Sequence, residues 1–145
     1  MNDDKMIIIE IGKMMREIFR IVRLRSLDQI EVNLTHEQKA LLFVISKQGS
    51  DVIQKDIAEE MGKDKSTILR LTDALEEKDL VRKVVDKKDR RKNYLMITKK
   101  GENILEQHLK VMNTVMNEII KDINEQDLQT FLNVVHLIKN KASKL

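Results

Sequence analysis

The side chains best suited to chemistry lie in one short basic segment, from Arg82 to Lys92. Its eleven residues include seven lysines or arginines and two aspartates, a net charge of +5, whereas the whole 145-residue chain carries only +3. A positive field confined to one hairpin and the helix before it is the electrostatic footprint of a DNA-binding winged helix-turn-helix. The segment therefore predicts double-stranded DNA as a partner.

Other kinds of chemistry have little support in the sequence. The three histidines, His36, His108 and His136, fall on different predicted elements without a paired carboxylate, and cysteine is absent, so a metal site is improbable. The absence of cysteine also excludes disulfides and thiol redox switches. No phosphate-binding glycine loop, dinucleotide fingerprint, metalloprotease motif or nucleophile elbow occurs. We therefore expect no catalytic residues, no cofactor and no enzymatic activity.

The hydropathy pattern bears on where the protein works. The longest uninterrupted apolar run is Ala40 to Ile45, far short of the roughly 18 residues that span a bilayer. No basic-then-apolar leader with a small-residue cleavage site opens the sequence. These features predict a cytoplasmic protein without a membrane partner.

The elements that must position the basic segment begin with two helices. Thr35 and Gln38 form a capping box that starts a helix ending near Gly49. A shorter helix is expected from about Ile53 to Met61, followed by a turn at Gly62. Asp64 is placed to cap the next helix, from about Lys65 to Lys78. Two short helices, a glycine-containing turn and a third helix make a helix-turn-helix.

The segment from Leu80 to Thr98 changes to a strand period. Valines precede a polar turn and Tyr94, Leu95 and Ile97 follow it, which predicts a β-hairpin with the basic segment at its tip. This hairpin is the wing.

Amphipathic helices flank this region, at about residues 4–27, 98–121 and 124–142. The first is apolar on more than one face, so it must be covered on several sides, either by the core of its own chain or, as we favour, by a second subunit. The predicted fold is mainly α with a small β-hairpin wing. It is a single domain of residues 1–145, with a winged helix-turn-helix at about 34–98 and dimerisation helices at about 4–27 and 99–143.

Taken together, these residues resemble the MarR family of bacterial transcription regulators. The resemblance rests on LTHEQKALLFVI from Leu34 and on IQKDIAEEMGKDKSTILRLTDALEEKDLVRKVVDKKDRRKNYLMITKKG from Ile53. It implies a homodimer, with the helix at Lys65 in the major groove of an operator and the wing in the adjacent minor groove. The family usually has glycine where Asp79 stands, a position that favours a left-handed backbone, and a proline after the first aspartate of the wing.

The predicted DNA-binding residues belong to the third helix and the wing. Ser66, Thr67 and Arg70 are suited to donate to phosphates or base edges. Leu69 either packs on a thymine methyl or is an ordinary exposed leucine. The resemblance places Arg91 in the minor groove with Asp89 as its orienting partner. The full set is Lys65, Ser66, Thr67, Leu69, Arg70, Lys87, Lys88, Asp89, Arg90, Arg91 and Lys92.

Regulation by a small-molecule effector is a further option. Methionine adapts to varied ligands, although its first role is to fill cores and interfaces. The expected place is a crevice between the winged helix and the dimerisation helices. The resemblance implies a phenolic or other aromatic carboxylate as the ligand, whose charge Arg16 or Arg20 could pair with. The candidate residues are Met14, Met15, Arg16, Ile18, Arg20 and Phe43.

The expected function is a DNA-binding transcription regulator, most simply a repressor that acts as a homodimer on a near-palindromic operator. The alternative is a winged-helix module that docks to another protein and does not read DNA. A wing with a net charge of +5 argues against that alternative.

Overall fold

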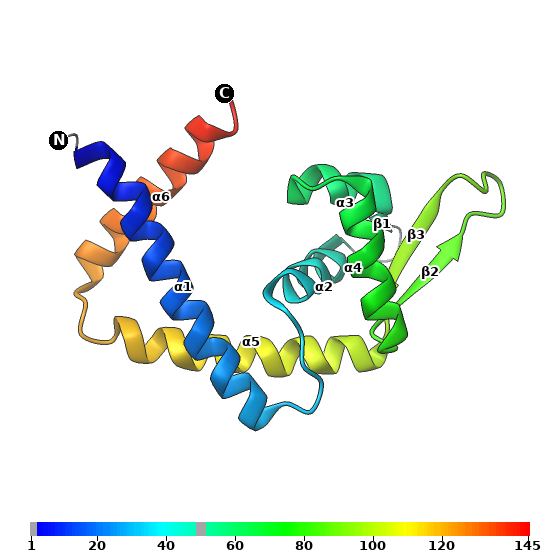
Figure 1. Ribbon diagram of the computed structural model, residues 1–145, viewed down its shortest axis with the longest axis horizontal. Coiled ribbons are helices and arrows are strands. Elements are labelled where there is room, and N and C mark those ends of the chain that lie inside the picture. The colour runs from blue at the N-terminus through cyan, green and yellow to red at the C-terminus, as the bar shows by residue number, and fades with distance from the viewer. Residues whose placement is uncertain (1–2, 49–51) are drawn as a thin grey trace. The chain divides into compact units, whose positions relative to one another are not determined.

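The computed structural model describes residues 3–48 and 52–145. Figure 1 labels its helices and strands along the chain. They are α1 (Asp3–Gln29), α2 (His36–Gln48), β1 (Val52–Ile53), α3 (Gln54–Met61), α4 (Lys65–Glu77), β2 (Val81–Val85), β3 (Asn93–Ile97), α5 (Lys99–Ile120) and α6 (Glu125–Ala142). The chain forms two compact units, residues 1–112 and 113–145, with the boundary inside α5.

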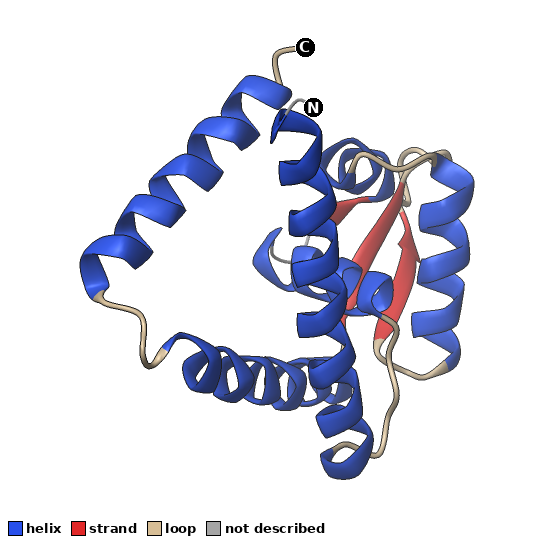
Figure 2. Ribbon diagram, turned by 60° about the vertical axis from the view of Figure 1, so that its left-hand side comes forward, coloured by secondary structure: helices blue, strands red, loops and turns tan. Residues whose placement is uncertain are grey.

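The mainly α fold with a β-hairpin wing is confirmed, and its elements agree with the predicted ones to within a few residues. The predicted end of α2 near Gly49 lies outside the described residues. One element was missed: Ile53 does not begin a helix but belongs to β1, which pairs antiparallel with β3 so that Val52 lies opposite Leu95. The hairpin thus becomes a three-stranded sheet in the order β1-β3-β2 (Figure 2). A two-residue strand is too short for an alternating pattern to reveal it.

The core of the first unit is where α2, α3, α4 and the sheet meet. Its fully enclosed side chains are Leu41, Leu42, Ile45, Ile57, Ile68, Thr72, Leu75, Leu80, Val81 and Leu95. On α4, the neighbours Leu71 and Thr72 are both buried. Thr72 is accommodated because its hydroxyl donates to the carbonyl of Ile68 at 2.7 Å, which satisfies this buried donor.

The helix caps follow from local sequence. The Thr35 backbone N–H donates to Gln38 Oε1 at 3.0 Å, and the Gln38 backbone N–H donates to Thr35 Oγ1 at 3.1 Å, so the predicted capping box is present. Asn124 caps α6 by accepting the Asp127 N–H at 2.8 Å. Asp64 stands at the N-cap of α4, but its carboxylate accepts the Ser66 hydroxyl and makes no capping bond to a backbone N–H.

At the end of α4, a tight turn directs the chain into the first strand of the wing. The backbone N–H of Asp79 donates to the carbonyl of Glu76 at 2.9 Å, and that of Leu80 donates to the carbonyl of Leu75 at 3.0 Å. These two bonds are the Schellman termination, which needs a left-handed residue. Asp79 supplies it with a φ of 61°, in agreement with the sequence prediction. An aspartate tolerates this region better than most residues do.

Two helices leave large apolar side chains uncovered within the single chain. Ile7, Ile8 and Ile9 of α1 are 55%, 74% and 49% exposed. In the second unit, no residue of α6 is buried, and Phe131 and Leu137 are about half exposed. None of the helices in the described part of the chain is both long and apolar enough to cross a membrane. The exposed apolar faces of α1 and α6 are typical of interaction surfaces.

Candidate nucleic-acid interface

The exposed residues of α4 are mostly polar or basic. The helix lies beside the wing (Figure 1). Ile68 and Leu75 anchor the opposite face in the core, which fixes the rotation of the helix about its axis. The predicted contact residues Lys65, Ser66, Leu69 and Arg70 are exposed, and Thr67 is half-buried. Leu69 is 44% exposed, so an apolar group stands on an otherwise polar surface.

Hydrogen bonds shape the tip of the wing. The backbone N–H of Asp86 donates to the carbonyl of Lys92 at 3.1 Å. The Asp86 carboxylate accepts the Lys88 backbone N–H at 2.9 Å and the Tyr94 hydroxyl at 3.0 Å. The Lys88 N–H bond, followed by the Tyr94 bond, lowers the pKa of Asp86 below its usual value. An ionised Asp86 therefore orders the turn through local bonds that do not require the missing proline.

The basic side chains of the tip project into solvent. Lys87, Lys88, Arg90, Arg91 and Lys92 are all exposed. Asp89 accepts the backbone N–H of Arg91 at 3.0 Å. The resemblance implied that Asp89 orients Arg91. In the structure, this hydrogen bond joins the Asp89 side chain to the main chain of Arg91.

Two bridges that the sequence analysis missed tie the wing to α4. Glu76 of α4 accepts the backbone N–H of Lys83 at 3.0 Å, and the Lys83 ammonium pairs with Asp73. Both bridges join α4 to β2, so the exposed face of the helix and the basic tip keep one mutual orientation. No sequence signal marks these pairs, since their partners lie on different elements and fit neither the helical nor the strand spacing.

A cavity of about 610 Å³ lies within the first unit, between α1, α2 and α5. Of the predicted effector residues, Arg16, Arg20 and Phe43 line it. Its wall also includes Phe19, Val22, Leu105, Leu109 and Met112. Met14, Met15 and Ile18, which the sequence analysis also proposed, are not among its lining residues. Arg16, Phe19, Arg20 and Arg23 follow the three-to-four-residue spacing of one helical face, and the other three fall off that face.

Two histidines border this cavity, and both have a lowered pKa. The ring of His36 stacks on Phe19 with 3.8 Å between centroids. His108 Nε2 lies 3.1 Å from the carbonyl oxygen of Val32. Burial is the main cause that lowers the pKa of each ring below 6.5, and the charge of Lys39 acts in the same direction.

These pKa values predict that the protein loses stability in mild acid. At a pH near the ordinary histidine pKa, the folded state binds fewer protons than the unfolded state. The two histidines therefore contribute fully to the free energy of unfolding above their unfolded-state pKa. This contribution is lost as the pH falls through their folded-state pKa. We expect the urea midpoint to fall between about pH 7.5 and about pH 5.5. The urea midpoint of His108→Gln should decrease less over this pH range than that of the wild type. His136→Gln, at an exposed position of α6, is the control. The same pH dependence for His108→Gln and wild type would refute the role of His108.

Comparisons with known proteins agree with this geometry. Residues 34–92 match the sequence model of the MarR family. The crystal structure of MarR is 26% identical, with a TM-score of 0.74 over 93% of this chain and 98% of that one. FabT of Streptococcus pneumoniae, solved in complex with DNA, is 19% identical, with a TM-score of 0.83 over 98% and 99% of the two chains. CouR of Rhodococcus jostii RHA1, solved with p-coumaroyl-CoA, is 22% identical, with a TM-score of 0.74 over 94% and 92%.

Proposed function

The chain belongs to the MarR family, and on that premise we propose that it is a homodimeric, sequence-specific DNA-binding repressor. The observation that carries the proposal is the exposed basic tip of the wing, held beside the outer face of α4 by the bridges from Glu76 and Asp73 to Lys83. A regulator of this kind acts on chromosomal DNA, and therefore in the cytoplasm.

In the proposed complex, α4 enters the major groove and the wing reaches the adjacent minor groove. Lys65, Ser66, Thr67 and Arg70 would meet phosphates and base edges, and Leu69 a thymine methyl. Arg91 would enter the minor groove, where a narrow groove concentrates negative potential. Lys87, Lys88 and Lys92 would attract the DNA backbone without reading sequence. FabT, which shares this fold, was solved in complex with DNA, and this supports DNA as the partner.

The proposed dimer covers the apolar faces of α1 and α6. These helices, with α5, would form the interface, at about residues 4–27 and 99–143, and the whole chain would act as one domain. Exposed isoleucines on α1 and a wholly unburied α6 support this assignment. The two-fold axis would set two α4 helices about one turn of DNA apart, and the operator would be a near-palindrome.

Relief of repression would come from a small ligand in the 610 Å³ cavity. An aromatic carboxylate suits the cavity, because Phe19 and Phe43 offer apolar contact and Arg16 and Arg20 offer cations. CouR, solved with an aromatic acyl-CoA thioester, shows that a protein of this fold holds an aromatic ligand. Oxidation of a thiol is excluded, since the chain has no cysteine.

Selection of bound sequences from random DNA tests the proposal most directly. We expect a near-palindromic site, together with a dimeric mass by light scattering at micromolar concentration and an interface of about 2,000 Å² or more. A monomeric mass would refute the dimer. Failure to recover any site, with no salt-dependent retention on heparin or calf-thymus DNA, would favour the alternative of a protein-docking module.

A further inference from the structure

The base of the wing is fixed by bonds between its two ends. The backbone N–H of Thr98 donates to the carbonyl of Leu80 at 3.0 Å, and its hydroxyl donates to the carbonyl of Asp79 at 2.6 Å. From there β2 and β3 extend together to the basic tip (Figure 1). Between Lys83 and Asp86 the strand advances by about 10 Å. A small rotation of the wing near its base therefore becomes a larger displacement of the tip.

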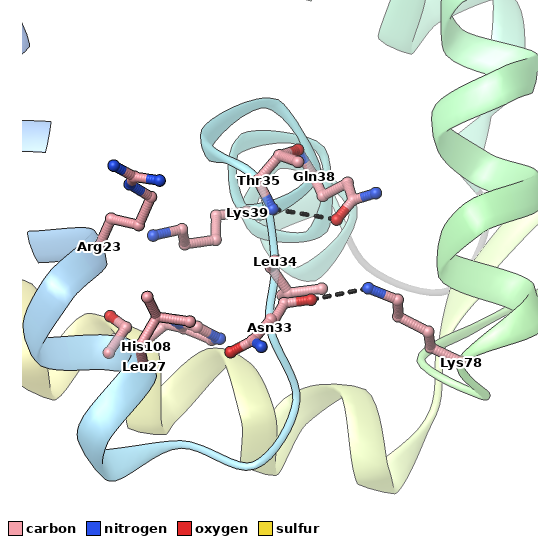
Figure 3. Close-up of a pocket in the computed structure, with 10 residues that line it drawn as sticks. Arg23, Leu27, Asn33, Leu34, Thr35, Gln38, Lys39, Lys78 and His108 are labelled. Atoms are coloured by element: carbon pink, nitrogen blue, oxygen red, sulfur yellow. Dashed lines mark hydrogen bonds between the residues drawn. The ribbon is translucent and has the colours of Figure 1, made fainter. Parts of the chain in front are cut away.

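The end of α4 is fixed to the body of the first unit. Lys78 follows directly after the helix, and its ammonium donates to the backbone carbonyl of Asn33, in the loop before α2, at 2.7 Å (Figure 3). Ile68 and Leu75 hold the inner face of the helix in the core. Because the helix has a fixed place, the position of the tip depends on what holds the wing against the helix.

The backbone N–H of Lys83 points out of the sheet. β2 is an outer strand in the order β1-β3-β2. Across the hairpin, the carbonyl of Leu80 accepts from Thr98, and the N–H of Asp86 donates to Lys92. In an antiparallel pair, such hydrogen-bonded positions alternate with positions that face outward, so the even-numbered residues of β2 are bonded to β3. β3 therefore cannot satisfy the N–H of Lys83.

Two carboxylates of α4 meet Lys83 at this edge. Glu76 accepts its backbone N–H at 3.0 Å, and Asp73 pairs with its ammonium. The two acidic residues are three positions apart, so they are neighbours on one face of the helix. A carboxylate also accepts a stronger hydrogen bond than a neutral group does. We call Asp73, Glu76 and Lys83 the wing clamp. Because it holds the strand at two atoms, it restricts rotation of the wing as well as its distance from α4.

The clamp also neutralises a charge on the exposed face of α4. Asp73 is exposed, and it lies four residues after Leu69 and three after Arg70, on the same stripe of the helix. An unpaired carboxylate at this place would repel the phosphates of a bound duplex. Pairing with Lys83 removes that repulsion. The ammonium of Lys83 is engaged in the clamp, so its role differs from that of the lysines at the tip.

We propose that Asp73, Glu76 and Lys83 are positioning residues that determine sequence discrimination without touching a base. The clamp sets the offset between the base edges that α4 meets and the minor groove that Arg91 enters. Attraction to any duplex depends on net charge and survives a change of this offset, whereas binding to the operator requires both contacts at once. The inference rests on the proposed function and names what sets its specificity.

Variants of Glu76 test the hydrogen bond in the clamp. Glu76→Ala should weaken operator binding about tenfold, the size of loss expected for one specific contact, without weakening binding to a scrambled duplex. Glu76→Gln keeps a carbonyl oxygen as acceptor and should restore most of the operator affinity. Glu77→Ala removes the same charge from the next, exposed residue of α4 and is the matched control. A folded Glu76→Ala protein with the wild-type preference for the operator would overturn the proposal.

A double-mutant cycle tests the ion pair in the clamp. Asp73→Asn and Lys83→Met should each lower the ratio of operator to scrambled affinity about fivefold, within the range for coupled neighbours. The ratio cancels the effect of net charge, which acts on both duplexes. Because the two residues act as a pair, the double variant should lose no more than the larger single loss. Losses that multiply in the double variant would refute the pairing.

Tyr94 reports whether the wing of each variant is intact. It is the single tyrosine of a chain without tryptophan, and its hydroxyl donates to the Asp86 carboxylate at 3.0 Å. Its fluorescence therefore comes from the wing. Unchanged emission and iodide quenching in Glu76→Ala, together with the lost preference, would show that the wing is displaced rather than unfolded. If quenching increases, Asp73→Asn decides the question, since it leaves the bond from Glu76 in place.

Exchange of the Lys83 amide proton, followed by ¹⁵N NMR, tests the clamp without DNA. It should be at least about tenfold faster in Glu76→Ala and close to the wild-type rate in Glu76→Gln. An unchanged rate in Glu76→Ala would refute the hydrogen bond. If the wild type prefers no duplex over another, the repressor proposal and the positioning role both fail. If the wild type selects an operator and Glu76→Ala selects it equally well, only the positioning role fails.

Discussion

Gly101→Ala should lower the free energy of unfolding by about 3 kcal/mol, the upper end of the range for an overpacked site. Gly101 lies in the first turn of α5, where an added Cβ would stand 2.1 Å from the carbonyl oxygen of Leu80 and 2.8 Å from Ile97 Cγ1. The Leu80 carbonyl cannot easily move, since it accepts the Thr98 backbone N–H at 3.0 Å and its own side chain is fully buried. Either α5 shifts or this bond breaks.

Gly62→Ala is the matched control for Gly101→Ala. Gly62 has a positive φ of 62°, but an added Cβ there would meet nothing within 4 Å. Its substitution tests backbone conformation without a clash and should cost about 1 kcal/mol. Urea unfolding of the two variants and the wild type gives the comparison. An unchanged free energy of unfolding for Gly101→Ala would refute the predicted clash with Leu80.

Arg91→Ala should weaken operator binding by about 1–3 kcal/mol, because it removes the proposed minor-groove contact. Lys88→Ala should instead weaken binding to all sequences nearly equally and reduce the salt slope by about one. Both side chains are exposed, so neither change disturbs the core. Affinity is measured against salt concentration on the selected operator and on a scrambled duplex.

Asp89→Ala tests whether Asp89 orients Arg91 for binding to the operator. It removes the acceptor that holds the Arg91 backbone N–H at 3.0 Å, and it also makes the wing more positive. Operator affinity should fall while affinity for scrambled DNA rises, a combination that loss of charge alone cannot produce. Lys121→Ala, an exposed lysine outside the wing, is the control. Unchanged operator affinity in a folded Arg91→Ala protein would contradict the wing assignment.

The sequence by itself determined the features that depend on neighbouring residues. The capping box of Thr35 and Gln38 and the left-handed Asp79 were both predicted correctly. The apolar periods of the long helices and the change to strand spacing in the wing gave the element order. These features are local because a cap or an amphipathic stripe involves residues within about one turn of each other. The net charge of the wing is likewise a property of consecutive residues.

Only the tertiary structure decided which distant residues meet. It added β1 to the sheet, joined Lys83 to α4, and placed Phe19 on the cavity wall. It also left His108 Nδ1 without a partner. Each of these depends on the packing of elements that lie far apart in the chain. A periodic pattern shows that a helix has an apolar face, but packing decides which other element covers that face.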